Sequence, residues 1–270
     1  MLNPARQPNR TFLTGTSAVT PPIRVTIWNE FVHELNSELV RSIYPYGIHR
    51  TIHDALAQKL AHRVTLHTAT LEQPDHGLPA SVLDTTDVLV WWGHLAHDQV
   101  ADEVVARIVR RIWEGMGLVA LHSAHLSKIF TRLMGTSCML RWRDTGETER
   151  LWIVDPSHPI VDGIDAEFVE LPTAEMYGEF FDIPTPDEVI MISWFDGGEV
   201  FRSACTFRRG KGRIFYFRPG HETFPIFHHS SVQQILANGV CWVAPRGSAY
   251  LGDGRQIKSP LSPIRRDSCN

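Results

Sequence analysis

The sequence predicts an α/β protein with a doubly wound, mostly parallel sheet and an added β-rich segment. Apolar runs of the length of buried strands alternate with amphipathic helical patterns over roughly the first half of the chain. After Gly135 the pattern changes to one strand after another, and a helical pattern returns near the C-terminus. Alternation of strands and helices with short connections favours right-handed crossovers, which give a parallel sheet covered on both faces.

Four apolar runs are predicted strands of the parallel part. They are residues 23–29, 64–70, 87–92 and 117–123. Apolar residues at helical spacing predict three helices that lie between or after these strands: residues 52–63, 97–115 and 124–133. Gly115 supplies the stop signal of the second helix.

The β-rich segment contains four further predicted runs. They are residues 141–154, 169–181, 188–195 and 201–220. The last run is expected to be a hairpin that turns at Arg209 to Gly212, because glycines and charged residues interrupt two apolar stretches there. Residues 231–244 predict a closing helix that returns to cover the sheet.

Length and composition indicate one main domain between two tails. The chain has 270 residues, of which 43% are hydrophobic, and this is enough to build one sizeable core. Residues 1–22 and 246–270 are rich in Pro, Ser and other poor core formers, so we expect flexible tails there. The domain itself is expected to span residues 23–245.

Charge and hydropathy exclude several classes of protein. The chain has 26 basic and 30 acidic residues and no extended basic block, which argues against a nucleic-acid partner. No apolar stretch reaches the roughly 18 to 20 residues of a membrane span, so a soluble cytoplasmic protein with no membrane partner is expected. The scattered cysteines, without CxxC spacing, are expected to be reduced and mostly structural: Cys138, Cys205, Cys241 and Cys269.

Two HxxH pairs follow neighbouring predicted strands. His94 and His97 come after residues 87–92, and His122 and His125 come at the end of the next strand. Ligands of open parallel sheets bind beyond the carboxyl ends of the strands. If each pair lies on one helical face, four imidazoles converge there, and imidazole is the commonest protein metal ligand. We therefore predict that these four histidines bind a divalent metal, with zinc favoured.

Other polar and aromatic residues are predicted to complete the pocket. His122, His125, His221 and Glu222 are candidate catalytic or supporting groups, and Glu179 is a candidate base. The proposed substrate contacts are Glu30 and His33, which follow the first strand, together with Trp92 and Tyr177, whose aromatic faces suit sugar rings.

The residues leave other chemistries open. Without a metal, the histidines could act as general acid and base, oriented by Glu179 or Glu222. A cysteine nucleophile is not expected, because the turn after the fourth strand reads LVALHSAH. Ser123 in that turn is a less favoured nucleophile, since the GxSxG pattern is absent.

Five ordered segments resemble the trehalose utilisation family, the ThuA-like proteins: WNEFVHE, WWGHLAHD, LVALHSAH, YGEFF and PGHETFPIF. The resemblance spans roughly residues 23–245. It implies a flavodoxin-like sheet of the class I glutamine amidotransferase-like type that lacks the glutaminase cysteine. It also implies a role in disaccharide catabolism beside a partner dehydrogenase that makes 3-keto sugars. The residues at the family motifs are His33, His94, His97, His122, His125, Glu179, His221 and Glu222.

The combined prediction is an enzyme that uses trehalose, a related disaccharide or its 3-keto form. A metal-assisted hydrolase, lyase or isomerase is favoured, and a glutaminase is not. The alternatives are a noncatalytic sugar-binding or accessory protein and a metal-free isomerase. The exact sugar, the metal and the oligomeric state are left open by the sequence.

Overall fold

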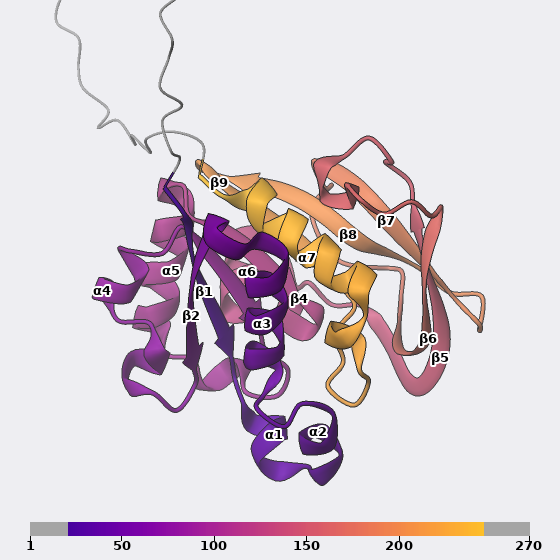
Figure 1. Cartoon of the computed structure of the whole chain (residues 1–270), viewed down its shortest axis with the longest axis horizontal. Helices are drawn as coiled ribbons and strands as arrows, with labels where there is room; N and C mark the ends of the chain where they lie inside the picture. Colours follow the sequence, from indigo (N-terminus) through magenta and orange to yellow (C-terminus); the bar gives the residue numbers. More distant parts are fainter. Residues whose placement is uncertain (1–20, 246–270) are drawn as a thin grey trace, which may run out of the picture.

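The computed structural model describes residues 21–245, which form a mixed α/β fold around one nine-stranded sheet (Figure 1). The strand order is β2-β1-β3-β4-β9-β8-β7-β5-β6. The tails expected at residues 1–22 and 246–270 therefore lie outside the described residues, apart from Pro21 and Pro22. No helix within the described range is long and apolar enough to cross a membrane.

Five strands form the parallel part of the sheet: β1 (Ile23–Asn29), β2 (Val64–Thr70), β3 (Val88–Trp92), β4 (Gly117–Leu121) and β9 (Gly212–Phe217). The first two have the predicted bounds, and β3 and β4 are slightly shorter than predicted. All five residues of β3 and all five of β4 are buried. Helices cover both faces of a parallel sheet, so its central strands can be uniformly apolar, as these two are.

The β-rich segment continues the same sheet in antiparallel fashion. Its strands are β5 (Arg141–Ile153), β6 (Phe168–Gly178), β7 (Glu188–Phe195) and β8 (Val200–Arg209). The predicted hairpin is confirmed, because β8 pairs with β9 and Arg209 lies opposite Gly212. β9 therefore belongs to both parts, since it runs parallel to β4 and antiparallel to β8.

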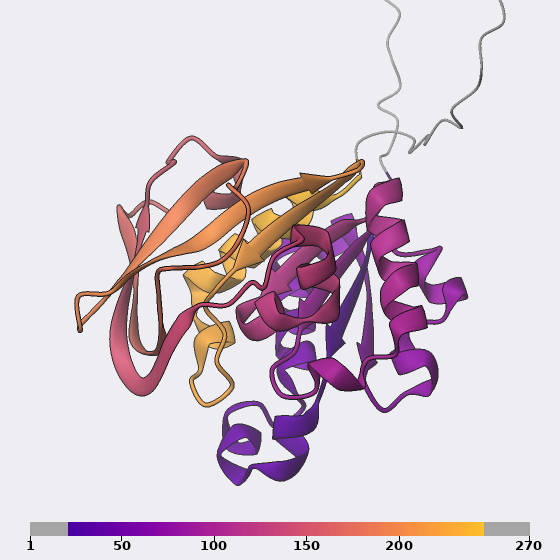
Figure 2. The same cartoon turned by 180° about the vertical axis from the view of Figure 1, so that it is seen from behind.

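Helices pack on both faces of the sheet (Figures 1 and 2). One apolar core lies under α3 (Ile48–Leu60) and the closing helix α7 (Ser230–Val243), and the other lies under α4 (Ala80–Leu83), α5 (Asp102–Glu114) and α6 (Lys128–Met134). Successive strand residues point to opposite faces, so Ile27 joins the first core and Trp28 the second.

Short elements at the ends of the strands differ from the prediction. The helices α1 (Val32–Asn36) and α2 (Glu38–Ile43) were not predicted. The predicted helix 97–115 begins as α5 only at Asp102, and a separate 3₁₀ turn covers His97–Gln99. The predicted strand 117–123 ends at Leu121, and a 3₁₀ helix at His122–Leu126 precedes α6. The Ser127 side chain caps α6 by accepting from the Phe130 amide, which separates these two helices.

The remaining 3₁₀ turns are Ala61–Arg63, Pro74–Gly77, Pro159–Val161 and Ile226–His228. Cys138, Cys205 and Cys241 are free thiols, and the first two are buried. The fourth cysteine, Cys269, lies outside the described residues.

Candidate metal centre and adjoining pocket

Three neighbouring strands bring histidines to one edge of the sheet. β3, β4 and β9 are adjacent and parallel, and they are followed by His94, by His122, and by His221 with Glu222. Each of these four residues offers one potential ligand atom, and the four atoms all lie within 4.8 Å of one another. The fold therefore gathers one compact group of metal-ligating side chains at the edge where ligands of such sheets bind.

The three imidazoles of this group are evenly spaced. Their ring centres are 5.4 Å apart for His94 and His122, 5.4 Å for His94 and His221, and 5.3 Å for His122 and His221. Each Nδ1 atom already has a partner: Glu222 Oε2 at 3.0 Å, the Arg218 carbonyl oxygen at 3.2 Å and Thr223 Oγ1 at 2.7 Å, respectively. Metal-binding histidines are commonly oriented by such contacts to a carboxylate or carbonyl, and their other ring nitrogen is then free to act as the ligand.

His122 occupies a backbone conformation that non-glycine residues rarely adopt. Its φ angle is 53°, in the left-handed region, directly after the end of β4. A Cβ atom on Gly220 would lie 3.1 Å from His122 Cβ and 2.8 Å from Phe227 Cζ, so only glycine lets the loop after β9 pass so closely. Strained backbone of this kind is concentrated at functional sites.

Glu175 on β6 completes the group, although the sequence did not single it out. Its Oε2 atom lies 3.3 Å from His122 Nε2, and both atoms are buried without a hydrogen-bond partner. Burial raises the pKa of Glu175 to about 8 and lowers the pKa of His122 well below its usual value. Because His122 Nδ1 donates to a carbonyl, its Nε2 carries a lone pair when the ring is neutral. A proton or a cation between Nε2 and Oε2 would satisfy both atoms.

Glu222 lies among the histidines. Its oxygens are 3.0 Å from His94 Nδ1 and 3.2 Å from His33 Nδ1. Burial opposes its ionisation, but its contacts with His94, His221 and His33 outweigh this and lower the pKa of Glu222 to about 2. His33 belongs to α1 and stacks on His94 with ring centres 5.0 Å apart. A charged Glu222 therefore orients two imidazoles at once.

Two of the predicted substrate contacts, Glu30 and Trp92, bond to the backbone of loops that carry the histidines. The Glu30 carboxyl group is 1% exposed and accepts the backbone amides of residues 94, 95 and 96 at 2.7, 2.9 and 3.0 Å. Trp92 is fully buried and donates its indole N–H to the Gly220 carbonyl at 2.9 Å. Both side chains hold the loops that carry the histidines, so the structure gives them a positioning role and leaves no face of Trp92 for a sugar.

The structure brings only one histidine of each HxxH pair into the group of four. His97 lies outside it, and its Nε2 atom is buried without a hydrogen-bond partner. His125 donates Nδ1–H to the Cys138 carbonyl oxygen at 2.9 Å, and its ring contacts Tyr177. The expected convergence of all four rings assumed one α-helical face for each pair. The pairs instead lie on a bend and short 3₁₀ turns, and His122 has its own left-handed backbone.

Glu179, predicted as a base, has partners outside this group. Its carboxylate accepts Arg202 Nε–H at 2.8 Å and the Phe181 amide at 2.8 Å. Burial opposes its ionisation, but the Arg202 side chain outweighs this and lowers the pKa of Glu179. The carboxyl groups beside the three imidazoles are those of Glu222 and Glu175, and the Glu179 carboxyl group is held by Arg202. Alternation along the strand places Glu175 on the same face as Tyr177, and this is the sequence signal that could have identified it.

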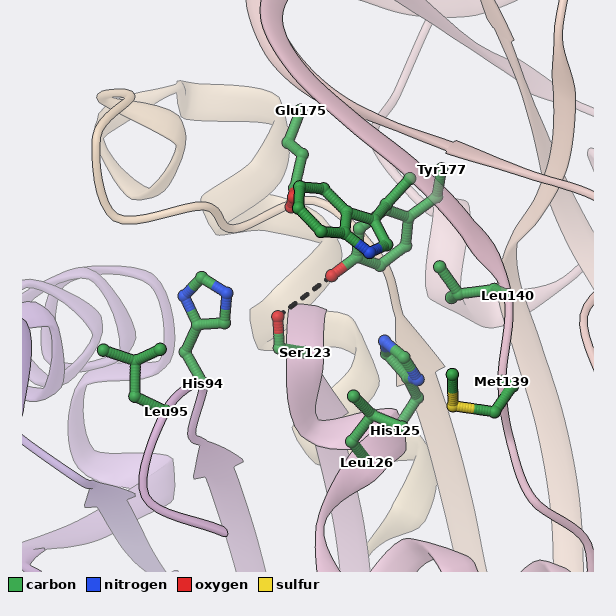
Figure 3. A pocket seen from close by; sticks show the side chains of 10 residues that line it. His94, Leu95, Ser123, His125, Leu126, Met139, Leu140, Glu175 and Tyr177 are labelled. Atoms are coloured by element: carbon green, nitrogen blue, oxygen red, sulfur yellow. Dashed lines mark hydrogen bonds between the residues drawn. The ribbon is translucent and has the colours of Figure 1, made fainter.

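A pocket of about 210 Å³ adjoins the group of four (Figure 3). His94 and Glu175 both line the pocket, and Figure 3 shows Glu175 above His94, with Ser123, Tyr177 and His125 to the right of His94. Ser123 Oγ and Tyr177 Oη are hydrogen-bonded at 2.9 Å. The remaining lining residues are apolar: Leu95, Leu126, Met139, Leu140 and Trp142. The pocket therefore offers polar groups at its base and apolar side chains around its mouth.

Comparison with known families identifies one that matches most of the chain. The family described as ThuA, trehalose utilisation, matches residues 24–243. The chain belongs to the ThuA family. Three of the family-like segments recognised in the sequence supply the cluster: WWGHLAHD carries His94, LVALHSAH carries His122, and PGHETFPIF carries His221 and Glu222.

Solved structures share the fold of this ThuA-family protein at low sequence identity. A putative ThuA-like protein from Parabacteroides merdae has a TM-score of 0.59 and 16% identity, over 83% of this chain and 90% of that one. One from Bacteroides uniformis has a TM-score of 0.60 and 14% identity, over 86% and 95%. A cytoplasmic protein from Salmonella typhimurium has a TM-score of 0.54 and 11% identity, over 82% and 99%. No curated protein matches the chain.

Proposed function

We propose that this ThuA-family protein is an enzyme of trehalose or related disaccharide utilisation whose site holds a divalent metal ion, with zinc favoured. The observation that carries the proposal is the triangle of imidazoles with ring centres 5.3 to 5.4 Å apart. Nitrogen ligands about 2.0 to 2.1 Å from a tetrahedral ion place their ring centres roughly 5 Å apart. The donor set therefore fits a three-histidine site with an open fourth position.

Each residue of the cluster has a distinct part in this proposal. His94, His122 and His221 would hold the ion, and Glu222 would orient His94 from the second ring nitrogen. A bound ion would supply a Lewis acid for a substrate oxygen or lower the pKa of a bound water. Glu175, which lines the pocket, would accept and return a proton at its Oε2 atom. Ser123 and Tyr177 would bind sugar hydroxyl groups.

A 3-keto disaccharide suits these groups well. Its carbonyl oxygen is the kind of group that a Lewis acid polarises, and polarisation makes the adjacent C–H more acidic. Glu175 lies at the boundary between cluster and pocket, within reach of such a hydrogen. Lyase and isomerase chemistry would begin from this activation, whereas a hydrolase would use the ion to activate a water molecule. A sugar dehydrogenase that makes the keto sugar would be the functional partner, and a cytoplasmic location agrees with the description of the Salmonella neighbour.

A metal-free isomerase is the second candidate, and one observation favours it. A proton shared between Glu175 Oε2 and His122 Nε2 would satisfy both unpartnered atoms without an ion. The pair would then pass a proton between neighbouring carbon and oxygen atoms of the sugar.

Metal analysis separates the two candidates. Protein purified without chelator, or reloaded with zinc, is expected to hold one ion per chain, and His122→Ala should lose it. His97→Ala is the matched control, because His97 lies outside the group of four, and it should keep the ion. Turnover is followed with trehalose and 3-keto-trehalose. Folded protein that binds no stoichiometric metal contradicts the proposal, and full turnover after metal stripping would establish the metal-free isomerase.

A further inference from the structure

The mouth of the pocket exposes large apolar side chains. Leu95, Met139 and Trp142 are 65%, 57% and 67% exposed, and Leu126 is 38% exposed. They come from different segments: the loop after β3, the loop before β5, the start of β5, and the 3₁₀ helix after β4. Apolar side chains gathered around a polar cavity are typical of a ligand surface, because a ligand covers them when it binds.

Trp142 is the largest of these side chains and the one best tied to the cluster. It lies directly opposite Tyr177 in the antiparallel pairing of β5 and β6. Tyr177 in turn stacks on His122, with ring centres 5.3 Å apart and planes 19° apart. Side chains directly opposite in such a pair lie about 5 Å apart at their Cβ atoms. A ligand in contact with the indole is therefore held beside the catalytic cluster.

The charges around the pocket favour an uncharged ligand at this wall. None of the ten lining residues is lysine or arginine, and Glu175 adds a carboxyl group. Arg143, a close chain neighbour of Trp142, is held by Glu147 and Glu199. A phosphate or carboxylate on the ring at the mouth would find no fixed positive charge among the lining side chains.

We infer that Trp142 is the specificity-determining wall of the site and stacks on the C–H face of an uncharged sugar ring. Leu95 and Met139 flank that ring, and its hydroxyl-bearing edge turns toward Ser123 and Glu175. The inference rests on the proposed function, because it names the part of the site that selects the sugar. Aromatic rings favour such contacts, since one face of a sugar is apolar and its edge is polar.

Calorimetric titration of the zinc-loaded protein with trehalose tests this role. We expect Trp142→Ala to weaken binding about tenfold, whereas Trp142→Phe keeps a ring and restores most of the affinity. Trp194→Ala is the matched control, because Trp194 is an exposed tryptophan of the same sheet, on β7, outside the pocket lining. Trehalose should also change the indole fluorescence of the native protein and of Trp194→Ala but not that of Trp142→Phe.

The outcomes separate this inference from the proposal beneath it. Equal affinity of native protein and Trp142→Ala for trehalose overturns the role of Trp142 and leaves the sugar site standing. Absence of binding of both trehalose and 3-keto-trehalose to the native, zinc-loaded protein overturns the proposed function and the inference together. Tighter binding of trehalose 6-phosphate than of trehalose overturns the selection of an uncharged ring.

Discussion

At the scale of single residues, Arg218 connects the two halves of the Glu175–His122 pair. Its carbonyl oxygen accepts His122 Nδ1–H at 3.2 Å, which fixes the tautomer of that ring. Its guanidinium donates to the backbone carbonyl of Glu175 at 2.6 Å, and it is itself paired with the buried Glu149. Arg218 thus contacts the His122 ring through its own carbonyl oxygen and the Glu175 backbone through its guanidinium, so one residue links the two segments that carry the unpartnered atoms.

Substitution of the two candidate carboxyl groups should have different effects. We expect Glu175→Gln to lower turnover at least a hundredfold while metal content stays unchanged, because the amide cannot accept and return the proton. Glu179→Gln should retain most of the turnover and cost roughly 1 kcal/mol of stability, because it weakens a half-exposed pair with Arg202. Turnover with 3-keto-trehalose and urea unfolding of both variants provide the comparison. Equal loss of turnover in both would contradict the assignment of Glu175.

Several candidate residues from the sequence lie in segments that follow strands, among them His94, His122, His221 and Glu222. The rule that ligands bind beyond strand ends pointed to these four, but it pointed equally to His97 and His125, which lie outside the group. Glu175 lies inside a strand of the β-rich segment, where a single acidic residue is ordinarily a solvent-facing one. Alternation with Tyr177 indicates which face of the strand Glu175 occupies, but its distance from His122 depends on how β6 pairs in the sheet, which local pattern does not show.

At the scale of elements, the loop after β3 is held by the end of β1. Glu30 accepts three consecutive backbone amides of this loop, and His94 is the first residue to donate. Its carboxyl group thereby supplies partners for three amides that lie outside any helix or strand. The position of one candidate ligand thus depends on a side chain from the neighbouring strand.

Glu30→Gln is expected to loosen this loop. The amide side chain has one acceptor oxygen in place of two, so at least one buried N–H loses its partner, at a cost of about 1 to 3 kcal/mol. Hydrogen exchange of residues 94–97 should accelerate, and zinc affinity should fall as His94 becomes mobile. Glu38→Gln on the exposed surface of α2 is the control and should change neither quantity. Unchanged exchange in Glu30→Gln would show that the loop is held by other contacts.

Long elements were predictable because their patterns are strong. β1, β2 and β7 have the predicted bounds, and the apolar runs of β3 and β4 identify buried parallel strands. The short helices α1 and α2 were missed, since five and six residues carry too few turns for a clear period. The start of α5 was placed too early because sequence alone does not distinguish a 3₁₀ turn from a first helical turn.

At the scale of the whole molecule, the site lies where the two parts of the sheet meet. The parallel strands β3 and β4 supply His94 and His122, and the antiparallel strands β5 and β6 supply Trp142 and Glu175. β9 joins the parts and adds His221 and Glu222. The order of the strands could not be read from the chain, because β9 follows four antiparallel strands in sequence yet pairs beside β4.

Several histidines are buried in their neutral form, so acid should destabilise the whole fold, and His125 offers the clearest case. Burial against Tyr177, Phe181 and Tyr216 lowers the pKa of His125 to about 3, although its bond to the Cys138 carbonyl opposes this, and the nearby His97 and His94 add to the lowering. In the unfolded chain this group takes a proton near pH 6.5. Between pH 6.5 and pH 3 the unfolded state therefore binds one more proton than the folded state. The free energy of unfolding therefore decreases as the pH falls below 6.5, by at most about 1.4 kcal/mol per pH unit.

This dependence can be isolated with His125→Gln, whose amide can still donate to the Cys138 carbonyl. The variant lacks the titrating group, so the difference in unfolding free energy between native protein and variant should shift by about 2 kcal/mol in the variant's favour from pH 7.5 to pH 5. Urea unfolding in the presence of chelator measures it, and the other buried histidines cancel because both proteins contain them. His62→Gln, at an exposed position, should show no comparable shift. A difference that stays constant over this range would mean that His125 binds its proton equally in the folded and the unfolded chain, and that the pocket around it admits water.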